Sequence, residues 1–247
     1  MDLGITGRTA LVTGSSSGLG FSAAKALSEA GAQVCLVSRS KQRVDDAAKK
    51  ISKDCQSIVA DLSDPDSIIS MLKNAQQVVG HIDILIANAG GPPPGNFETT
   101  DLGLFPEALQ VNLLSTVSMC QELIPKMSKN EWGRVVAVTS VAAREPNPQL
   151  ILSNTARSGL TSFLKTTATE VASSGVTINS IQPGLHSTDR LNELFTDLED
   201  LALQVPTKRL GDPDDFGKVV AFLCSEQAKF ITGAAIPVDG GSTKGLQ

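Results

Sequence analysis

Short apolar runs alternate with longer helical segments along the whole of this sequence. The first run, Thr9–Thr13, is nearly all apolar, as expected of a strand that is covered on both faces. Strands that alternate with helices build parallel βαβ units, and right-handed crossovers wind such units into a doubly wound sheet. We therefore expect an α/β fold, a Rossmann-type doubly wound parallel sheet of about seven strands flanked by helices. The expected strands are Thr9–Thr13, Gln33–Val37, Ser57–Ala60, Asp83–Ala87, Val135–Thr139, Val176–Ile181 and Ala235–Val238.

Helical patterns fill the segments between these strands. One of them, 104–127, reads as a single long helix that tolerates Pro106 near its start. No repeat or linker divides the chain, so residues 1–247 are expected to form one dinucleotide-binding and catalytic domain. The loop at about 185–206 is expected to shape the substrate pocket, because long loops in compact domains usually carry function. The other expected helices are 21–30, 44–51, 67–79, 155–173 and 214–223, and the apolar residues that suggest a lid are Leu191, Leu194, Phe195 and Leu198.

Composition argues against several classes of partner. The net charge of -5, without a basic stripe, argues against a nucleic acid. The four cysteines are far apart and form no CxxC pair, so we expect no metal site. The segment after Met1 lacks the basic and apolar regions of a secretory signal, and no apolar run approaches the length that spans a bilayer. We expect no membrane partner and a cytoplasmic location.

A glycine-rich turn, TGSSSGLG, lies directly between the first strand and the first helix. Glycines at such a position permit a tight turn and let the backbone approach a pyrophosphate, and the N-terminus of the following helix favours negative charge. The position between strand and helix makes a dinucleotide site a better interpretation than a simple turn. The residues expected to contact the cofactor are Gly14, Ser16, Ser17, Gly18, Leu19 and Gly20.

The end of the second strand predicts which dinucleotide is bound. Ser38 stands where an acidic residue would bind the adenosine ribose and select NAD, and Arg39 follows it. A guanidinium offers a fixed cationic fork for a 2′-phosphate, so we expect NADP(H). The alternative is that Arg39 is a solvated arginine at a strand end. Lys41 and Arg43 either add positive field there or are simply exposed.

Further motifs occur in the order expected of a known family. The chain resembles the short-chain dehydrogenase/reductase family along nearly its full length. This resemblance implies an adenine contact by Asp61 with Leu62, a structural and cofactor-binding Asn88-Ala89-Gly90 motif, and a helix asparagine, Asn112, that helps hold a proton-relay water. It also implies that Ser140 orients the substrate and that Pro183, Gly184 and Thr188 lie near the nicotinamide.

The family's catalytic Tyr-x-x-x-Lys pair is missing, because the sequence contains no tyrosine. Alignment places Ser153 at the tyrosine position and Arg157 at the lysine position, on the helix after Ser140. A serine hydroxyl is a poor acid near neutral pH, whereas an arginine keeps the positive charge and can still bind the nicotinamide ribose. We therefore expect that cofactor binding is retained and that the usual proton donor, the tyrosine, is lost.

Two replacements for the tyrosine are considered. His186 lies just beyond Pro183, and histidine is suited to proton transfer near pH 7; otherwise it is an exposed loop residue. The other candidate is a water held by Asn112 and Ser153. Arg144 and Glu145 either bind a polar substrate or form a solvated charge pair.

Three functions remain open. The first is an NADP(H)-dependent oxidoreductase of a small carbonyl or alcohol, which resembles the 3-oxoacyl carrier-protein reductase branch. The second is a non-catalytic NADP(H)-binding protein with a regulatory or structural role, and the third is a dehydration or isomerisation. The resemblance implies a homotetramer or dimer, for which Leu160, Phe163 and Leu164 offer weak support because they fit an intrachain core equally well.

Overall fold

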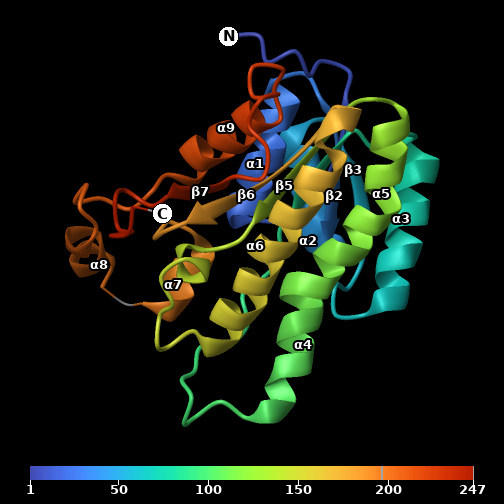
Figure 1. Ribbon diagram of the computed structural model, residues 1–247. Coiled ribbons are helices and arrows are strands. Elements are labelled where there is room, and N and C mark those ends of the chain that lie inside the picture. Colours follow the sequence, from blue (N-terminus) through green and yellow to red (C-terminus); the bar gives the residue numbers. More distant parts are fainter. Residues whose placement is uncertain (196, 247) are drawn as a thin grey trace.

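The computed structural model describes residues 1–195 and 197–246, and in it seven parallel strands form one sheet (Figure 1). The strand order is β3-β2-β1-β4-β5-β6-β7, which reverses direction between β1 and β4. This is the doubly wound α/β sheet that the sequence predicted. The strands are β1 (Thr9–Thr13), β2 (Gln33–Ser38), β3 (Gln56–Val59), β4 (Ile84–Ala87), β5 (Gly133–Val138), β6 (Val176–Pro183) and β7 (Ala235–Val238).

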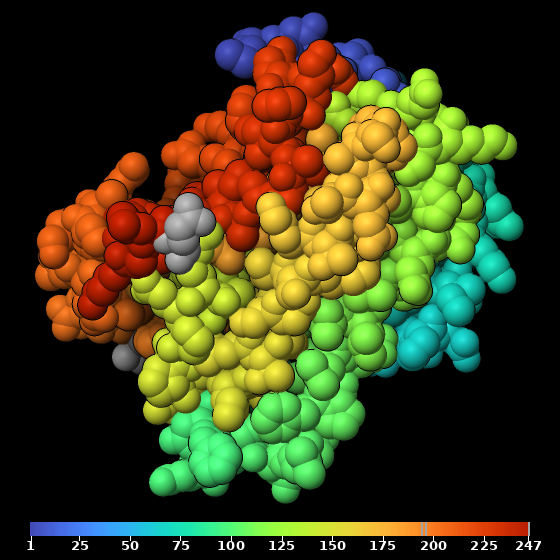
Figure 2. Space-filling view, viewed as in Figure 1, coloured from blue at the N-terminus to red at the C-terminus, as the bar shows by residue number. Residues whose placement is uncertain are grey.

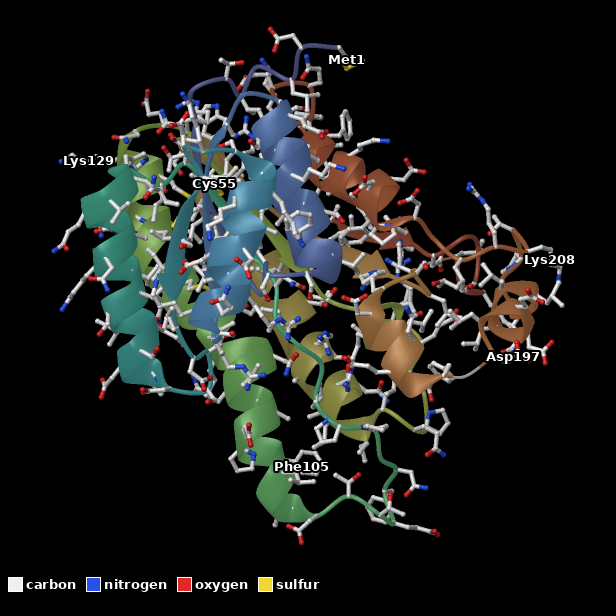
Figure 3. The ribbon with its side chains drawn as sticks, turned by 180° about the vertical axis from the view of Figure 1, so that it is seen from behind. Met1, Cys55, Phe105, Lys129, Asp197 and Lys208 are labelled. Atoms are coloured by element: carbon white, nitrogen blue, oxygen red, sulfur yellow. The ribbon has the colours of Figure 1, made fainter. Side chains whose placement is uncertain are left out.

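Helices cover both faces of the sheet, and each face has its own apolar core (Figure 1; Figure 3). Side chains such as Leu27, Val44 and Phe216 join α1, α2 and α9 to one face. Side chains such as Met71, Leu123 and Leu164 join α3, α5 and α6 to the other. Burial on both faces explains why the central strands read as continuous apolar runs. These helices are α1 (Gly18–Glu29), α2 (Lys41–Ile51), α3 (Pro65–Val79), α5 (Ser115–Lys129), α6 (Ile151–Val171) and α9 (Pro213–Leu223).

The expected single helix over 104–127 is interrupted. A short helix, α4 (Phe105–Leu109), passes into a π-helical turn over Gln110–Leu114 before α5 begins. The π turn inserts one extra residue into the helical repeat, which apolar spacing alone does not reveal. Such turns often occur at functional sites. Asn112, a predicted site residue, lies inside this one.

The carboxyl ends of the strands meet at one edge of the sheet and there position the site. The glycine-rich turn follows β1, Ser38 ends β2, and Asn88 follows β4. Ser140 comes two residues after the end of β5, and Pro183 is the last residue of β6. Because the strand order reverses between β1 and β4, a crevice is expected at this edge.

The segment after β6 contains the expected helical patches, α7 (Asp189–Leu194) and α8 (Leu198–Gln204). Of the four residues expected to form a lid, Leu191 is buried and Phe195 is exposed, whereas the side chain of Leu194 lies outside the described residues. Figure 3 labels Asp197 and Lys208 on this segment, at the margin of the molecule. Across residues 1–195 and 197–246, no helix combines the length and apolarity needed to cross a membrane.

Candidate functional site

The glycine-rich turn admits only glycine at two of its positions. Gly14 has a φ of +57°, and a Cβ added to it would stand 2.7 Å from the carbonyl oxygen of Asn88. A Cβ added to Gly20 would collide with the carbonyl oxygen of Gly14. The bare backbone lets β1, the turn and α1 come close together and leaves room above them. The turn therefore has the cradle form that a pyrophosphate requires.

The N-terminus of α1 lacks a side-chain cap. Ser17 occupies the cap position but makes no capping hydrogen bond, and its Oγ instead accepts one from Arg43 Nη2 at 3.1 Å. The first amides of a helix have no partner within the helix and carry partial positive charge. With no cap from Ser17, this helix end suits an anionic ligand such as a phosphate.

An open groove of about 550 Å³ runs along the carboxyl edge of the sheet. Arg39 and Arg43 line one end of it, next to Ser38 at the end of β2. Arg43 was expected only to add field or to be exposed; its first-turn position in α2 brings it to the groove. The groove thus brings the predicted catalytic residue Asn112 together with eight predicted cofactor residues, namely Gly14, Ser16, Ser38, Arg39, Asp61, Leu62, Ala89 and Gly90.

Asn88 braces the turn rather than lining the groove. Its Nδ2 donates to the carbonyl oxygen of Gly14 at 2.9 Å. Thr13 Oγ1 donates to the carbonyl oxygen of Asn88 at 2.8 Å and accepts from the Asn88 amide at 3.0 Å. These bonds fix the end of β4 against the end of β1, so Asn88 contributes to the shape of the site through the backbone.

The segment after β6 packs against the start of α1. A Cβ added to Gly18 would stand 3.7 Å from Thr188 Cγ2. Gly18, expected at the pyrophosphate, and Thr188, expected near the nicotinamide, are therefore neighbours. Pro183 pairs with Val238 of β7, and Gly184 packs directly against Asp239. Leu19 faces the core between the sheet and α1 and is partly buried there.

Ser153 and Arg157 form a buried pair on α6. Arg157 Nη1 donates to Ser153 Oγ at 2.7 Å. Burial lowers the pKa of the Arg157 guanidinium to about 10, although it remains a cation near neutral pH. A Cβ added to Gly91, which lines the groove, would stand 4.0 Å from Arg157 Nη1. Arg157 therefore lies next to the groove, at Gly91. Gly91 was not among the predicted site residues.

Ser140 and Asn112 keep unused hydrogen-bonding capacity. Ser140 Oγ accepts from the Ala142 amide at 3.1 Å, which leaves its hydroxyl proton free to donate. Asn112 Nδ2 donates to the Ala108 carbonyl oxygen at 3.3 Å, but its buried Oδ1 has no partner. Buried polar atoms are nearly always paired, so this oxygen suits a water or a ligand donor. Ser158 Oγ ties α6 to the turn after Ser140 by donating to the Ala143 carbonyl oxygen at 3.1 Å.

His186 is not among the residues that line the groove. It is 5% exposed, its Nδ1 lies 3.2 Å from the Gly184 carbonyl oxygen, and its ring packs edge-on against Phe216. Burial lowers its pKa below the usual value for histidine. It lines another cavity, of about 160 Å³, with residues of α9 and β7. The interpretation as an exposed residue is wrong, and the role of proton donor stays a prediction that this position does not favour.

Arg144 and Glu145 have structural partners. Arg144 Nη2 donates to the carbonyl oxygen of Ala235 at 2.9 Å. Glu145 Oε1 accepts from the backbone amides of Lys244 and Gly245 at 2.6 and 2.7 Å. Neither residue is a member of a solvated charge pair; together they hold β7 and the segment after it beside the turn that follows Ser140.

Comparisons with known proteins agree with this geometry. A family model described as enoyl-(acyl carrier protein) reductase matches residues 14–243. The chain is 34% identical to the 3-oxoacyl-[acyl-carrier-protein] reductase FabG of Aquifex aeolicus, over 98% of this chain and 99% of the relative. It is 32% identical to dehydrogenase/reductase SDR family member 4 of Homo sapiens, over 98% of this chain and 90% of the relative.

Solved structures are similar along the whole chain. The structure of L-sorbose reductase from Gluconobacter frateurii, complexed with NADPH and L-sorbose, superposes with a TM-score of 0.94 at 30% identity and covers 100% of both chains. YwfH, described as an NADPH-dependent reductase involved in bacilysin biosynthesis, superposes with a TM-score of 0.93 at 24% identity, over 98% of this chain and 100% of YwfH. The second similarity supports the fold alone.

Proposed function

Because this chain belongs to the short-chain dehydrogenase/reductase family of oxidoreductases, we propose that it uses NADP(H) to interconvert a small carbonyl compound and its alcohol. The observation that carries the proposal is the groove, which two arginines and the turn before the uncapped N-terminus of α1 line. Arg157 of the buried pair lies next to Gly91, another residue of its lining. Each end of the groove suits a different part of the cofactor.

Arg39 and Arg43 support the choice of NADP(H) over NAD(H). Both line the groove beside Ser38, at the place where an acidic residue would repel a 2′-phosphate. Guanidinium groups bind phosphate through charge-assisted, often bidentate hydrogen bonds. The similar L-sorbose reductase was solved with NADPH, which is consistent with this assignment.

NADPH, when bound, supplies the hydride. The chain's own residues then have to orient the carbonyl and stabilise negative charge on its oxygen. Ser140 and Ser153 both accept a hydrogen bond from the protein and keep a hydroxyl proton to donate to that oxygen. Arg157 holds Ser153 in place and adds positive charge, and such preorganised donors favour developing charge on oxygen.

In this proposal a water relays the proton: it gives one proton to the substrate oxygen while it takes another from the solvent side, so no hydroxide is left behind. Neither the Ser153 hydroxyl nor the Arg157 guanidinium is an effective acid near neutral pH. The unpartnered, buried Oδ1 of Asn112 is suited to hold a water, which is the second of the two replacements considered for the tyrosine. His186 is the weaker candidate, because it packs against Phe216 and lines another cavity.

The test is NADPH oxidation by the purified protein over a panel of ketones, aldehydes and 3-oxoacyl thioesters, with NADPH binding measured in the same sample. Turnover on any of them supports the proposal, and tighter binding of NADPH than of NADH supports the cofactor assignment. Failure to bind either dinucleotide would refute the assignment of the groove.

A second function is favoured by the same buried pair. In the alignment with the family, Ser153 and Arg157 stand at the positions of the Tyr-x-x-x-Lys pair, so the chain is suited to bind NADP(H) without chemistry, as a regulatory or structural subunit. Tight NADPH binding with no turnover would support this alternative. The double variant Ser153→Tyr with Arg157→Lys would then test whether only the acid is missing, because it should restore turnover.

Assembly into a homodimer or homotetramer is part of the proposal. Figure 2 shows α4, α5 and α6 side by side on one face of the molecule. Leu160 and Leu164 are buried in the intrachain core and Phe163 packs against it, so the core interpretation of these three residues is correct and they do not support an interface. Light scattering of the purified protein measures the assembly directly.

A further inference from the structure

Arg157 is a buried cation that has no counter-ion among residues 1–195 and 197–246. Its side chain is 8% exposed, yet it takes part in none of the ion pairs formed by the described residues. Among the described residues, its guanidinium hydrogen-bonds only to the neutral Ser153. Burying an unpaired charge is costly, and such groups are normally paired.

The other buried arginine provides an internal comparison. Arg134 is 2% exposed, and its Nη2 lies 3.3 Å from Glu226 Oε1. Its Nη1 also donates to the carbonyl oxygens of Gly133 and Gly175. Arg134 thus has an anionic partner and several acceptors from the chain itself. Arg157 has only a hydroxyl among the described residues, which leaves its charge open to an anionic ligand.

The guanidinium of Arg157 is available to such a ligand. It carries five N–H groups in a planar fork, of which Ser153 takes one. In the part of the chain that the structure describes, Arg157 Nε and Nη2 are not fully buried polar atoms without a partner, so water-sized groups can reach them. Nη1 lies next to Gly91, which lines the groove and has no side chain to separate the two.

The cofactor alone does not provide the missing charge at this end of the groove. Its phosphates fit the other features, namely Arg39, Arg43 and the N-terminus of α1. The nicotinamide ribose offers neutral hydroxyls, which need a donor but do not neutralise a cation. A planar fork with free N–H groups matches a carboxylate in both charge and shape.

We propose that Arg157 binds a carboxylate of the substrate, so that the substrate is a short oxo acid or the corresponding hydroxy acid. This inference rests on the proposed function, because it assumes that the substrate carbonyl lies beside Ser153. A carboxylate attached directly to the carbonyl carbon, or one carbon further away, then places the carbonyl oxygen near the Ser153 hydroxyl. Arg157 acts here as a specificity-determining residue.

The experiment compares each acid with its own methyl ester, which keeps the carbonyl and removes the charge. The probes are benzoylformate with methyl benzoylformate, and acetoacetate with methyl acetoacetate. NADPH oxidation gives kcat/KM for each, and calorimetry gives the Kd of each for the complex of the protein with NADP⁺. Wild type is expected to favour the acid at least about tenfold, since a hydrogen bond to a charged group is worth that much.

Two variants separate Arg157 from general charge effects. In Arg157→Gln the preference for the acid is expected to disappear, and in Arg157→Lys it is expected to fall, because lysine keeps the charge but not the fork. Lys165→Gln is the matched control, because it removes one positive charge from an exposed position on the same helix and should leave the preference unchanged. The acid-to-ester ratio is compared between proteins because an ester differs in intrinsic reactivity. Circular dichroism checks folding, and if Arg157→Gln does not fold, the wild-type ratio and Arg157→Lys decide.

The outcomes separate this inference from the proposed function. Equal kcat/KM and Kd for acid and ester in wild type would overturn the inference even if the protein turns over other carbonyls. An acid preference that survives in Arg157→Gln would also overturn it. Arg157-dependent binding of the acid without turnover would support the carboxylate site while refuting the oxidoreductase activity.

Discussion

Removing the Ser153 hydroxyl is expected to destabilise the folded protein. In Ser153→Ala the buried Arg157 loses the hydrogen bond that joins Nη1 to Ser153 Oγ at 2.7 Å. Hydrogen bonds to charged groups contribute roughly 1.5–3 kcal/mol, and most of that contribution should be lost here because Ser153 and Arg157 are only 6% and 8% exposed, so water replaces the missing bond poorly. For a chain of this length the free energy of unfolding should fall by about that amount, and Tm by about 3–12 °C.

Thermal and urea unfolding of the protein without cofactor measure this effect. Ser162→Ala is the matched control, because it makes the same change at an exposed position of the same helix and should shift Tm little. A double-mutant cycle with Arg157→Met isolates the pair, since a buried charge replaced by an apolar side chain is often tolerated. A loss below about 0.5 kcal/mol in Ser153→Ala, or the same loss in the Arg157→Met background, would refute the reasoning.

The remaining predictions concern the cofactor and pH. Gly20→Ala should abolish NADPH binding, because its Cβ meets the Gly14 carbonyl oxygen; calorimetry with NADPH checks this. Arg39→Gln with Arg43→Gln should weaken NADPH binding at least about tenfold and leave NADH binding nearly unchanged, measured as two Kd values. The lowered pKa of His186 means that the unfolded chain takes up this proton first as the pH falls below 6.5, so the free energy of unfolding should fall there. Urea unfolding between pH 7 and pH 5 should show a shallower decline in His186→Gln, whereas an unchanged slope would contradict this cause.

The fold could be predicted from local patterns because its information is local. Runs such as Leu11–Val12 and Leu85–Ile86 are buried on both faces of a parallel sheet, and their apolarity is visible in the sequence. The π turn around Asn112 could not be predicted, because the packing around it decides where the helical hydrogen bonds change, and no residue type marks that position in the sequence. Its unpartnered Oδ1 is a property of the packing and has no counterpart in the sequence.

The site could be predicted only where a motif fixes the backbone. The glycine-rich turn dictates where Gly14 and Gly20 lie, whatever surrounds them. His186 has no such motif, and its burial depends on Phe216, which lies on a helix distant in the sequence. Arg43 likewise reaches Ser17 only because α2 begins beside the turn. Contacts between distant segments decided each of these cases.

Deuterium transfer tests most directly whether this tyrosine-free chain is an oxidoreductase. The protein is incubated with NADPH that carries two deuterium atoms at C4 of the nicotinamide and with the carbonyl compound that gives the fastest NADPH oxidation. The alcohol is analysed by mass spectrometry and NMR. The account predicts one deuterium at the carbinol carbon for each NADPH consumed, and a slower transfer in Ser153→Ala. Bound NADPH with no deuterium in any product would contradict it.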